Sequence, residues 1–241
     1  MAIVPGAALF LVAAFALSDS LAQGDSHPDS VAARTSRYEV LISEADSLYE
    51  AGRYADSVDR YSSAIEAVRD PAPFDLYKAA CSAALDGQVG RSYGFIHRAL
   101  EAGLAILGEE GGVAIIPYMD AQSDLAPLRT DPELWAEVHA AAWRSMQAHY
   151  GETFDPEIAE ELYEIRQRDQ DIRQEYMALA GTHGESIPDS LLNPLKERIV
   201  RVDSENLSRL EEIIAEHGWP GASLVGGLGA NAAFLVVQHA P

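Results

Sequence analysis

An internal repeat of 35 residues constrains the fold of this 241-residue chain more than any other feature. Small, apolar and turn residues recur at that offset in six matched pairs: Leu41 and Leu76, Ala45 and Ala80, Gly52 and Gly87, Ser57 and Ser92, Tyr61 and Ile96, and Ala64 and Ala99. A period of this length is typical of stacked helical hairpins, each too small to bury its own apolar face. The repeat therefore predicts an all-α fold with a short solenoid that offers a partner-binding surface.

Each repeat unit is predicted to be two helices joined at a glycine. In the first unit the apolar residues follow helical spacing up to Gly52, and a second such run stops at Asp70-Pro71. The Gly52-x-Tyr54 turn and the small residues at the helix contacts resemble tetratricopeptide repeats over about residues 38–103. This resemblance implies a concave groove that binds an extended peptide. The alternative is that the hairpins only space the C-terminal module.

A degenerate third unit is expected to close the repeat array. Gly111-Gly112 and Pro117 interrupt the chain, and Asp131 is a suitable N-cap for the helix that follows. That helix carries Trp135 and Trp143, which we expect to cover the core rather than to hold a cofactor. The helical repeat domain is therefore placed at residues 36–148, followed by a C-terminal helical module at 150–241.

The charge of the chain limits its partners. It has 17 basic and 38 acidic residues, a net charge of −21. A negative field of this size repels nucleic acid and anionic membrane surfaces, whereas basic peptides and cations stay compatible. The single cysteine, Cys81, excludes an intrachain disulfide and a thiolate metal cluster, and its Ala-rich surroundings predict burial. We expect no cofactor and no metal site.

The first residues predict export. An apolar run from Ala7 to Leu17 is short for a membrane span, and Ser20-Leu21-Ala22 provides the small residues that signal peptidase requires. Residues 1–22 are therefore predicted to be a signal peptide and 23–35 a polar linker, which gives a secreted or periplasmic protein. No Lys or Arg precedes the apolar run, so an uncleaved membrane anchor is the alternative.

One aspartate interrupts the apolar pattern of the C-terminal module. Side chains at helical spacing predict a helix packed along its length: Ile158, Leu162, Ile165, Ile172, Tyr176 and Leu179. Asp169 occupies the position that should continue this stripe, and Arg166 and Arg173 can both reach it on the same face. Two interpretations stay open. One is an intrahelical Arg–Asp–Arg network, and the other is a charged pocket floor that orients a ligand or a histidine.

A second helix of the module is predicted to begin at Asp203, as the N-cap, and to end at Gly218. Asn206 lies one turn into it and would face Asp169 if the two helices pack antiparallel.

The last helix is predicted from Ala230 to Ala240, after a glycine-rich tight turn. The turn is a better interpretation than a phosphate cradle, because no strand precedes the glycines and no Lys follows them. The helix is apolar nearly all round and is therefore expected to be buried. His239 at its end is either a core histidine or a partner of Asp169, a pairing that would set its tautomer for base catalysis.

These segments together resemble an uncharacterised bacterial family over most of residues 158–240. The motifs that carry the resemblance are Arg166-x-x-Asp169-Gln170-x-x-Arg173, Asp203-x-x-Asn206, Gly218-Trp219-Pro220-x-x-Ser223-x-Val225-Gly226, Gly229-Ala230-x-Ala232-Ala233 and Val237-Gln238-His239-Ala240. The resemblance implies no activity. Its members generally continue with a further helix after the His-Ala pair, so we expect this chain to be truncated or to lack that cover.

The leading functional hypothesis is an exported interaction scaffold that binds a peptide or protein partner through its helical repeats. The alternatives are a hydrolase-like enzyme, with Asp169 and His239 as candidate catalytic residues, and a module that binds a small ligand or a cation. No nucleophile motif supports the enzyme. The candidate binding residues of the module are Arg166, Asp169, Gln170, Arg173, Asn206, Trp219, Ser223, Gln238 and His239.

Overall fold

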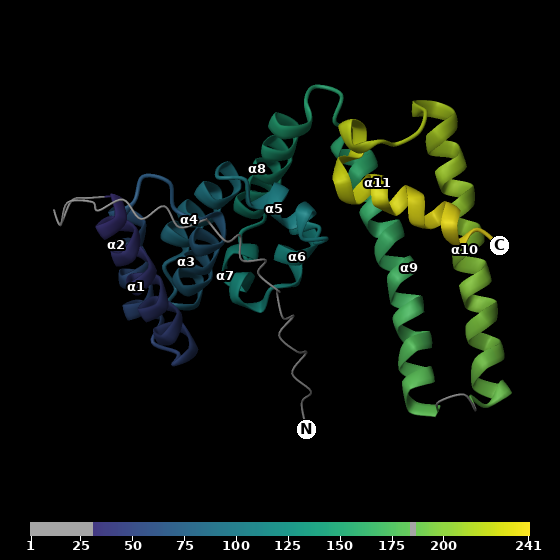
Figure 1. The fold of residues 1–241 in the computed structure, drawn as a ribbon, viewed down its shortest axis with the longest axis horizontal. Helices are drawn as coiled ribbons and strands as arrows, with labels where there is room; N and C mark the ends of the chain where they lie inside the picture. Colours follow the sequence, from purple (N-terminus) through teal and green to yellow (C-terminus); the bar gives the residue numbers. More distant parts are fainter. Residues whose placement is uncertain (1–30, 184–186) are drawn as a thin grey trace.

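The computed structural model describes residues 31–183 and 187–241, which form eleven α-helices and one 3-10 turn, with no strand among them (Figure 1). The elements in chain order are α1 (Val31–Glu50), α2 (Tyr54–Ala67), α3 (Pro73–Leu85), α4 (Val89–Glu101), α5 (Leu104–Glu110), α6 (Ile115–Ala121), η1 (Ser123–Leu125), α7 (Ala126–Arg129), α8 (Pro132–Tyr150), α9 (Pro156–His183), α10 (Asp189–His217) and α11 (Ala222–His239). The expected all-α fold is confirmed. The predicted signal peptide lies outside the described residues. Residues 31–35, expected to belong to the linker, instead begin α1.

The two repeat units form hairpins, α1–α2 and α3–α4, with equivalent internal bonds. The Ser57 hydroxyl donates a hydrogen bond to the carbonyl of Ala45 at 2.9 Å, and Ser92 donates to Ala80 at 2.7 Å. The turn glycine of each unit has a positive φ, 70° in the first and 76° in the second, a backbone conformation that favours glycine. The offset of 35 residues is therefore also a repeat of helix pairing in space.

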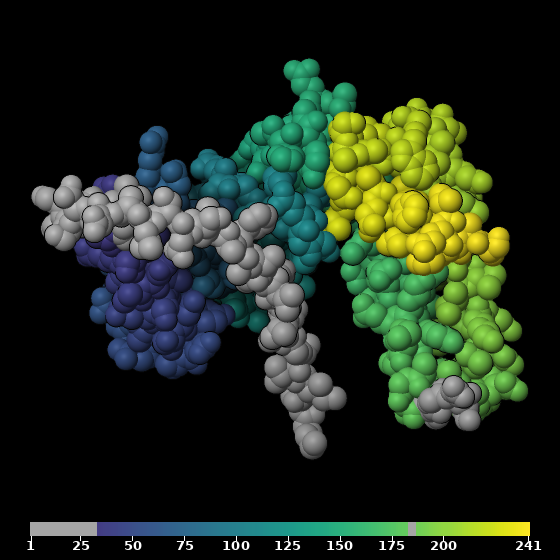
Figure 2. All heavy atoms as spheres, viewed as in Figure 1, coloured from purple at the N-terminus to yellow at the C-terminus, as the bar shows by residue number. Residues whose placement is uncertain are grey.

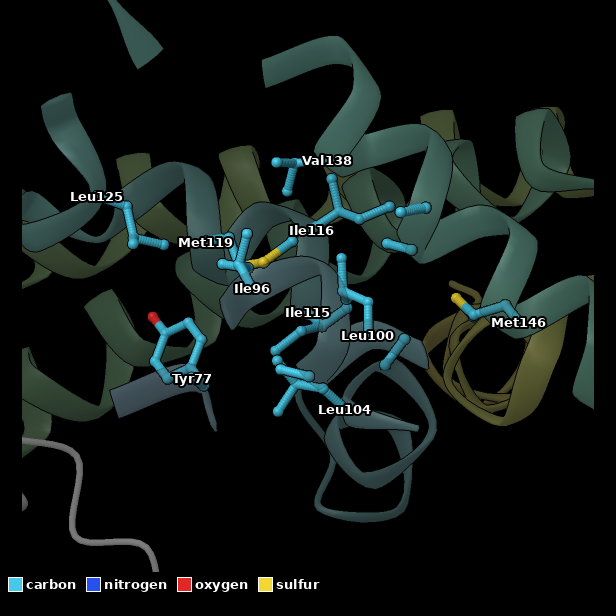
Figure 3. Close-up of a cluster of buried hydrophobic side chains, with 14 of the residues drawn as sticks. Tyr77, Ile96, Leu100, Leu104, Ile115, Ile116, Met119, Leu125, Val138 and Met146 are labelled. Carbon is cyan, nitrogen blue, oxygen red and sulfur yellow. The ribbon is translucent and has the colours of Figure 1, made fainter. Parts of the chain in front are cut away.

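Short helices take the place of a third hairpin. After α5, α6, η1 and α7, the Asp131 carboxylate accepts hydrogen bonds from the backbone N–H groups of Glu133 (3.1 Å) and Leu134 (3.0 Å), which caps α8 as predicted. Trp135 and Trp143 are partly buried against the core, also as predicted. Figure 3 shows the buried side chains that α3 to α8 pack together, among them Ile96, Leu100, Ile116, Met119, Leu125, Val138 and Met146.

In the C-terminal region, α9 and α10 form an antiparallel hairpin and α11 packs against both (Figure 1). Ion pairs between the two long helices fix their register, with Arg209 on Glu161 (2.5 Å) and Arg198 on Glu175 (2.7 Å). The apolar stripe of α9 is buried only as far as Ile172. Beyond that residue the two helices extend past α11 (Figure 1), and among the described elements they pack only against each other. The prediction of a helix packed along its whole length is therefore wrong for its last turns.

Both remaining helices begin earlier than predicted. α10 starts at Asp189 and continues through Pro194, so Asp203 lies in the middle of the helix and its carboxylate pairs with another side chain instead of capping. Proline removes one hydrogen bond near the start of α10 without ending the helix. The predicted end at Gly218 is confirmed.

α11 starts at Ala222, and the glycine-rich segment lies inside it as a bend at Gly226, with φ 73° and ψ 175°. The helix is also less buried than predicted. Phe234 is 58% exposed and Val237 is 50% exposed, although other side chains of α11 pack against α5, α8, α9 and α10.

A buried carboxylate joins the two regions of the molecule. Glu109 of α5 accepts hydrogen bonds from the hydroxyls of Tyr150 and Tyr163 and, at 2.9 Å, from the backbone N–H of Gly227. A Cβ atom at Gly226 would lie 2.5 Å from a Glu109 carboxylate oxygen, so the bend needs glycine for space as well as for its positive φ. Figure 2 shows α11 in yellow lying directly against the teal surface of the preceding region.

Candidate functional site

The helical hairpins carry a groove of about 340 Å³ between α1, α2, α3 and the α6–η1 segment. Its walls are aromatic and mainly acidic, and they comprise Asp46, Tyr49, Glu50, Tyr61, Phe74, Tyr77, Lys78, Cys81, Tyr118, Gln122 and Asp124. Three carboxylates face one ammonium group in this lining, so the groove keeps an excess of negative charge. An electrostatic field of that sign favours cationic ligands.

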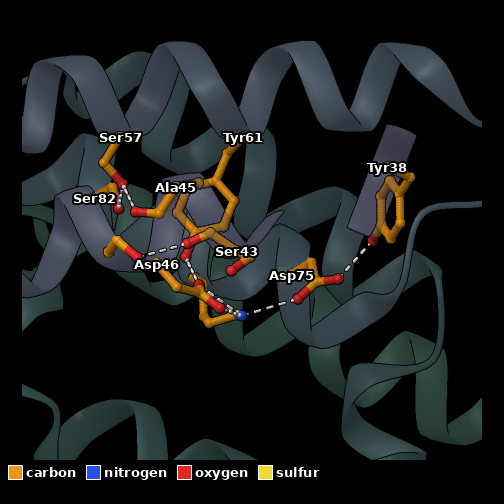
Figure 4. Close-up of polar contacts among 10 residues, drawn as sticks. Tyr38, Ser43, Ala45, Asp46, Ser57, Tyr61, Asp75 and Ser82 are labelled. Atoms are coloured by element: carbon orange, nitrogen blue, oxygen red, sulfur yellow. Dashed lines mark hydrogen bonds and ion pairs between the residues drawn. The ribbon is translucent and has the colours of Figure 1, made fainter. Parts of the chain in front are cut away.

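Lys78 lies within the groove, and its contacts indicate that the groove walls can bind a cation. Its Nζ atom is 2.8 Å from both carboxylate oxygens of Asp46 and 3.1 Å from Asp75 (Figure 4). The same atom lies 5.8 Å from the ring centroids of Tyr61 and Phe74, within the range of a cation–π interaction. The groove therefore holds one side-chain cation between carboxylates and aromatic faces.

The groove tyrosines are hydrogen-bond donors. Tyr49 donates to Asp124, and Tyr61 donates to Asp46. Burial, followed by these bonds, raises the pKa of both hydroxyls, so both stay protonated. The buried Tyr77 hydroxyl has no hydrogen-bond partner among the described residues, and burial raises its pKa as well.

The cysteine behaves as predicted. Cys81 is buried, and burial raises the pKa of its thiol to about 12. A thiol that keeps its proton is a poor nucleophile and a poor metal ligand.

The second candidate site surrounds Asp169, whose side chain is 1% exposed. One carboxylate oxygen accepts from His239 Nδ1 at 2.8 Å and from Arg173 Nη1 at 2.9 Å, and the other accepts from Gln170 Nε2 at 2.8 Å. Arg173 also reaches Asp203 of α10 at 2.9 Å. The hydrogen-bond capacity of this buried carboxylate is thus used by charged and polar partners from α9 and α11.

Two predicted members of this site are close to it but lack partners. Arg166, expected to be the second arginine on Asp169, forms no ion pair with any residue in 31–183 or 187–241, and its buried Nε has no hydrogen-bond partner. The interpretation as an Arg–Asp–Arg network is therefore wrong for Arg166. Asn206 is 2% exposed, and its Nδ2 also lacks a partner within the described part of the chain.

The other three predicted binding residues make no hydrogen bond or ion pair with this cluster among the described residues. Trp219 is exposed in the α10–α11 connection, and Ser223 is at the opposite end of α11 from His239, before the bend at Gly226. The backbone carbonyl of Ser223 accepts a hydrogen bond from Thr153 at 3.1 Å. Gln238 is exposed. Of the other eight predicted residues, three therefore contact the Asp169 side chain: Gln170, Arg173 and His239.

Residues 31–183 and 187–241 contain no group of three or more His, Cys, Asp or Glu side chains suited to a metal ion. α11, with a mean hydropathy of 1.2, is the one helix among them that is long and apolar enough to cross a membrane. A packed core helix has the same composition, and α11 packs on α8, α9 and α10.

Together, fold and site define an all-α protein in which a region of paired helices is followed by a helical module with a buried Asp–His–Arg cluster. Residues 156–241, which form that module, match the family of unknown function DUF6624. The resemblance of this segment to an uncharacterised family is thereby confirmed. No curated protein and no solved structure matches the chain.

Sequence reasoning missed the residues of the groove and of the joint at Glu109. Asp46 meets Lys78 across 32 positions, and Tyr163 meets Glu109 across 54, so no local spacing indicates either pair. The sequence feature that could have indicated the groove is the density of aromatic residues beside the small residues of the repeat.

Proposed function

We propose that the protein is an exported scaffold that binds an extended basic segment of a partner protein in the groove of its helical hairpins. The observation that carries this proposal is the position of Lys78, whose ammonium lies between carboxylates and over two aromatic rings. Glu50 and Asp124 line the same groove and have no cationic partner among the described residues. A Lys or Arg of a bound peptide can make the corresponding contacts with them.

Two further observations support a peptide ligand. The groove lining combines aromatic faces with carboxylates, the surface that the alkyl chain and cation of a Lys or Arg residue bind. The net charge of −21 attracts a basic chain over long range and increases its association rate. The likeness of the hairpins to peptide-binding tetratricopeptide repeats is part of this proposal, and so is export, which depends on residues 1–22.

Binding of fluorescent peptides of graded charge to the full chain tests the proposal. We expect affinity to rise with Lys and Arg content and to fall with added salt, because the charges involved are partly exposed. Glu50→Gln and Asp124→Asn should each weaken binding about fivefold, or about 1 kcal/mol, the size of a partly exposed ion pair. Fluorescence anisotropy provides the measurement.

Glu216→Gln is the matched control, since it removes an exposed carboxylate on α10, far from the groove. It should leave affinity unchanged. Equal binding of acidic and basic peptides, or equal binding by the groove variants and the wild type, would contradict the proposal.

A second candidate function is a ligand-binding or hydrolase-like module centred on His239. The observation that favours it is the 2.8 Å contact between Asp169 and the Nδ1 of a histidine that is 22% exposed. A carboxylate on Nδ1 fixes the tautomer and leaves Nε2 able to accept a proton from a substrate. Chromogenic carboxylic and phosphate esters provide the assay. Turnover that disappears in His239→Gln supports an enzyme, and turnover that the substitution leaves unchanged contradicts one.

A further inference from the structure

The residues around Asp169 differ in whether their hydrogen-bonding groups are already used. Both oxygens of Asp169 are occupied, by Arg173 and His239 on one and by Gln170 on the other. Arg173 divides its guanidinium between Asp169 and Asp203. These residues hold one another in place and have little left to offer a ligand.

Two donors in the same region are not used in this way. The Nε of Arg166 and the Nδ2 of Asn206 are both buried, and neither has a partner in the described part of the chain. Asn206 is 2% exposed, so bulk water does not surround its amide. Buried donors without acceptors are unfavourable, and native proteins keep few of them unless an ion, a water or a ligand completes the site.

The register of α9 and α10 places the two residues that carry these donors at similar heights on neighbouring helices. The Arg173–Asp203 pair lies on one side of them along the hairpin and the Glu161–Arg209 pair on the other. Between those two crosslinks, Arg166 and Asn206 lie at about the same level along the hairpin. Arg166 is one turn before Asp169 on the same face of α9, so both donors are close to the helix end that carries His239.

We propose that Arg166 and Asn206 form the binding site for the oxyanion of a small ligand, a carboxylate or a phosphate, beside His239. A guanidinium and an amide NH₂ are donors that recognise anionic oxygens, and Arg166 is the cation of this cluster that no described carboxylate neutralises. Asp169 and Arg173 are positioning residues, since their contacts are with protein groups. The inference deepens the second candidate function by naming its ligand class, and it is independent of the groove.

Titration of the full chain with inorganic phosphate, and separately with acetate, tests this site at constant ionic strength. The measurement is the NMR shift of the Arg166 Nε–H and Asn206 side-chain amide signals. We expect saturation of both signals by at least one of the two anions below about 50 mM, which corresponds to weak millimolar binding. Saturation by phosphate alone or by acetate alone identifies the preferred oxyanion.

Two variants show whether the shifts report this site. Asn206→Asp keeps the shape of the side chain but puts a carboxylate against the anion, and Arg166→Gln removes the charge, so each should weaken binding at least about tenfold. Arg198→Gln, which removes an arginine from a surface pair on the same hairpin, should leave binding unchanged. Circular dichroism checks that the variants are folded.

The inference is overturned if neither anion shifts the two signals, in which case a buried water completes the donors. It is also overturned if the variants bind as the wild type does. Neither result bears on turnover by His239 or on peptide binding at the groove, so failure here is distinguishable from failure of either function proposed above.

Discussion

Three carboxylates are buried among the described residues, those of Glu109, Asp169 and Asp203, and the first two differ in what surrounds them. Glu109, at the joint between the two regions, accepts only from neutral donors: two tyrosine hydroxyls and a backbone N–H. Asp169, inside the C-terminal module, accepts from an arginine, a glutamine and a histidine. Glu109 connects α5 to α8, α9 and α11, whereas Asp169 connects elements of a single module.

The two carboxylates differ in whether buried hydrogen-bond donors near them lack an acceptor. Around Glu109, the two tyrosine hydroxyls and the backbone N–H all donate to the carboxylate, so none of these donors lacks an acceptor. Around Asp169, the buried donors of Arg166 and Asn206 stay unpaired. Burial of a carboxylate therefore does not by itself indicate a functional site. Buried donors without an acceptor beside the carboxylate are a better indication of a functional site, because a fold selected for stability alone gains by removing such donors.

The largest expected effect comes from adding a methyl group at the joint. Gly226→Ala places a Cβ 2.5 Å from Oε1 of the Glu109 carboxylate, which three donors hold in place, at a backbone φ of 73°. We expect a loss of about 4 kcal/mol in the free energy of unfolding, from left-handed strain and overpacking together. Urea denaturation followed by circular dichroism measures it.

Gly221→Ala is the control, because no atom lies within 4 Å of its added Cβ and its φ is −80°. It should change stability by no more than about 0.5 kcal/mol. Truncation of Glu109 to Ala in the Gly226→Ala background should cost less than it does in the wild type, since the clash is removed. Additive losses would show that Glu109 is not what Gly226 accommodates.

Asp169→Asn comes next, with an expected loss of about 3 kcal/mol, because it leaves Arg173 and His239 without the buried charge that pairs with them. Asp171→Asn, on the exposed face of the same helix, should be nearly neutral. The ¹⁵N shifts of His239 should also change, as its Nδ1 loses a carboxylate acceptor. A small loss together with unchanged histidine shifts would mean that Asp169 does not orient this ring.

The sequence allowed prediction of features that depend on local pattern. The 35-residue period, the Asp131 cap, the end of α10 at Gly218 and the conspicuous Asp169 all follow from neighbours within a few turns. The structure places His239 on Asp169, as one of the two interpretations proposed, because α11 crosses the α9–α10 hairpin there.

Features that depend on long-range packing could not be predicted. Asp203 has the side chain of a helix cap, but its role as a partner of Arg173 is set by a helix 30 residues away. Glu109 is one of many acidic residues in this chain, and only the meeting of α5, α8, α9 and α11 distinguishes it. Gly226 looks like a turn residue, and the bend inside α11 is required by a carboxylate 117 positions earlier in the chain.

At alkaline pH we expect a smaller loss in the free energy of unfolding, which comes from the surroundings of Glu109 and not from those of Asp169. Burial, followed by the bond to Glu109, raises the pKa of Tyr150 from 10.0 to about 12, so the folded state holds this proton more tightly than the unfolded state. The stability that this provides is complete below pH 10 and is lost as the pH rises toward 12. The Asp169 cluster has no tyrosine among its partners, and arginine keeps its charge throughout that range.

Comparison of the free energy of unfolding at about pH 9 and about pH 11 tests this difference. Tyr150→Phe should lose less stability over that interval than the wild type, because one of the titrating hydroxyls is gone. Tyr176→Phe, at the exposed far end of α9, should lose as much as the wild type does. A Tyr150→Phe protein with the full alkaline loss would show that the joint is not held by a protonated tyrosine.

The smallest expected effect is the most informative about function. Arg166→Met keeps the length of the side chain and removes a guanidinium whose buried Nε has no partner, so the free energy of unfolding should stay the same or rise by up to about 1 kcal/mol. Arg173→Met, seven residues along the same face of α9, should lose about 3 kcal/mol, because Asp169 and Asp203 both lose the arginine that pairs with them. Thermal and urea denaturation of the two variants provide the comparison. Equal losses would make Arg166 a structural residue like Arg173 and remove the contrast between the two carboxylates. A stable Arg166→Met protein that no longer binds phosphate or acetate would show that this arginine is kept for a ligand, at a position where the fold itself gains nothing from it.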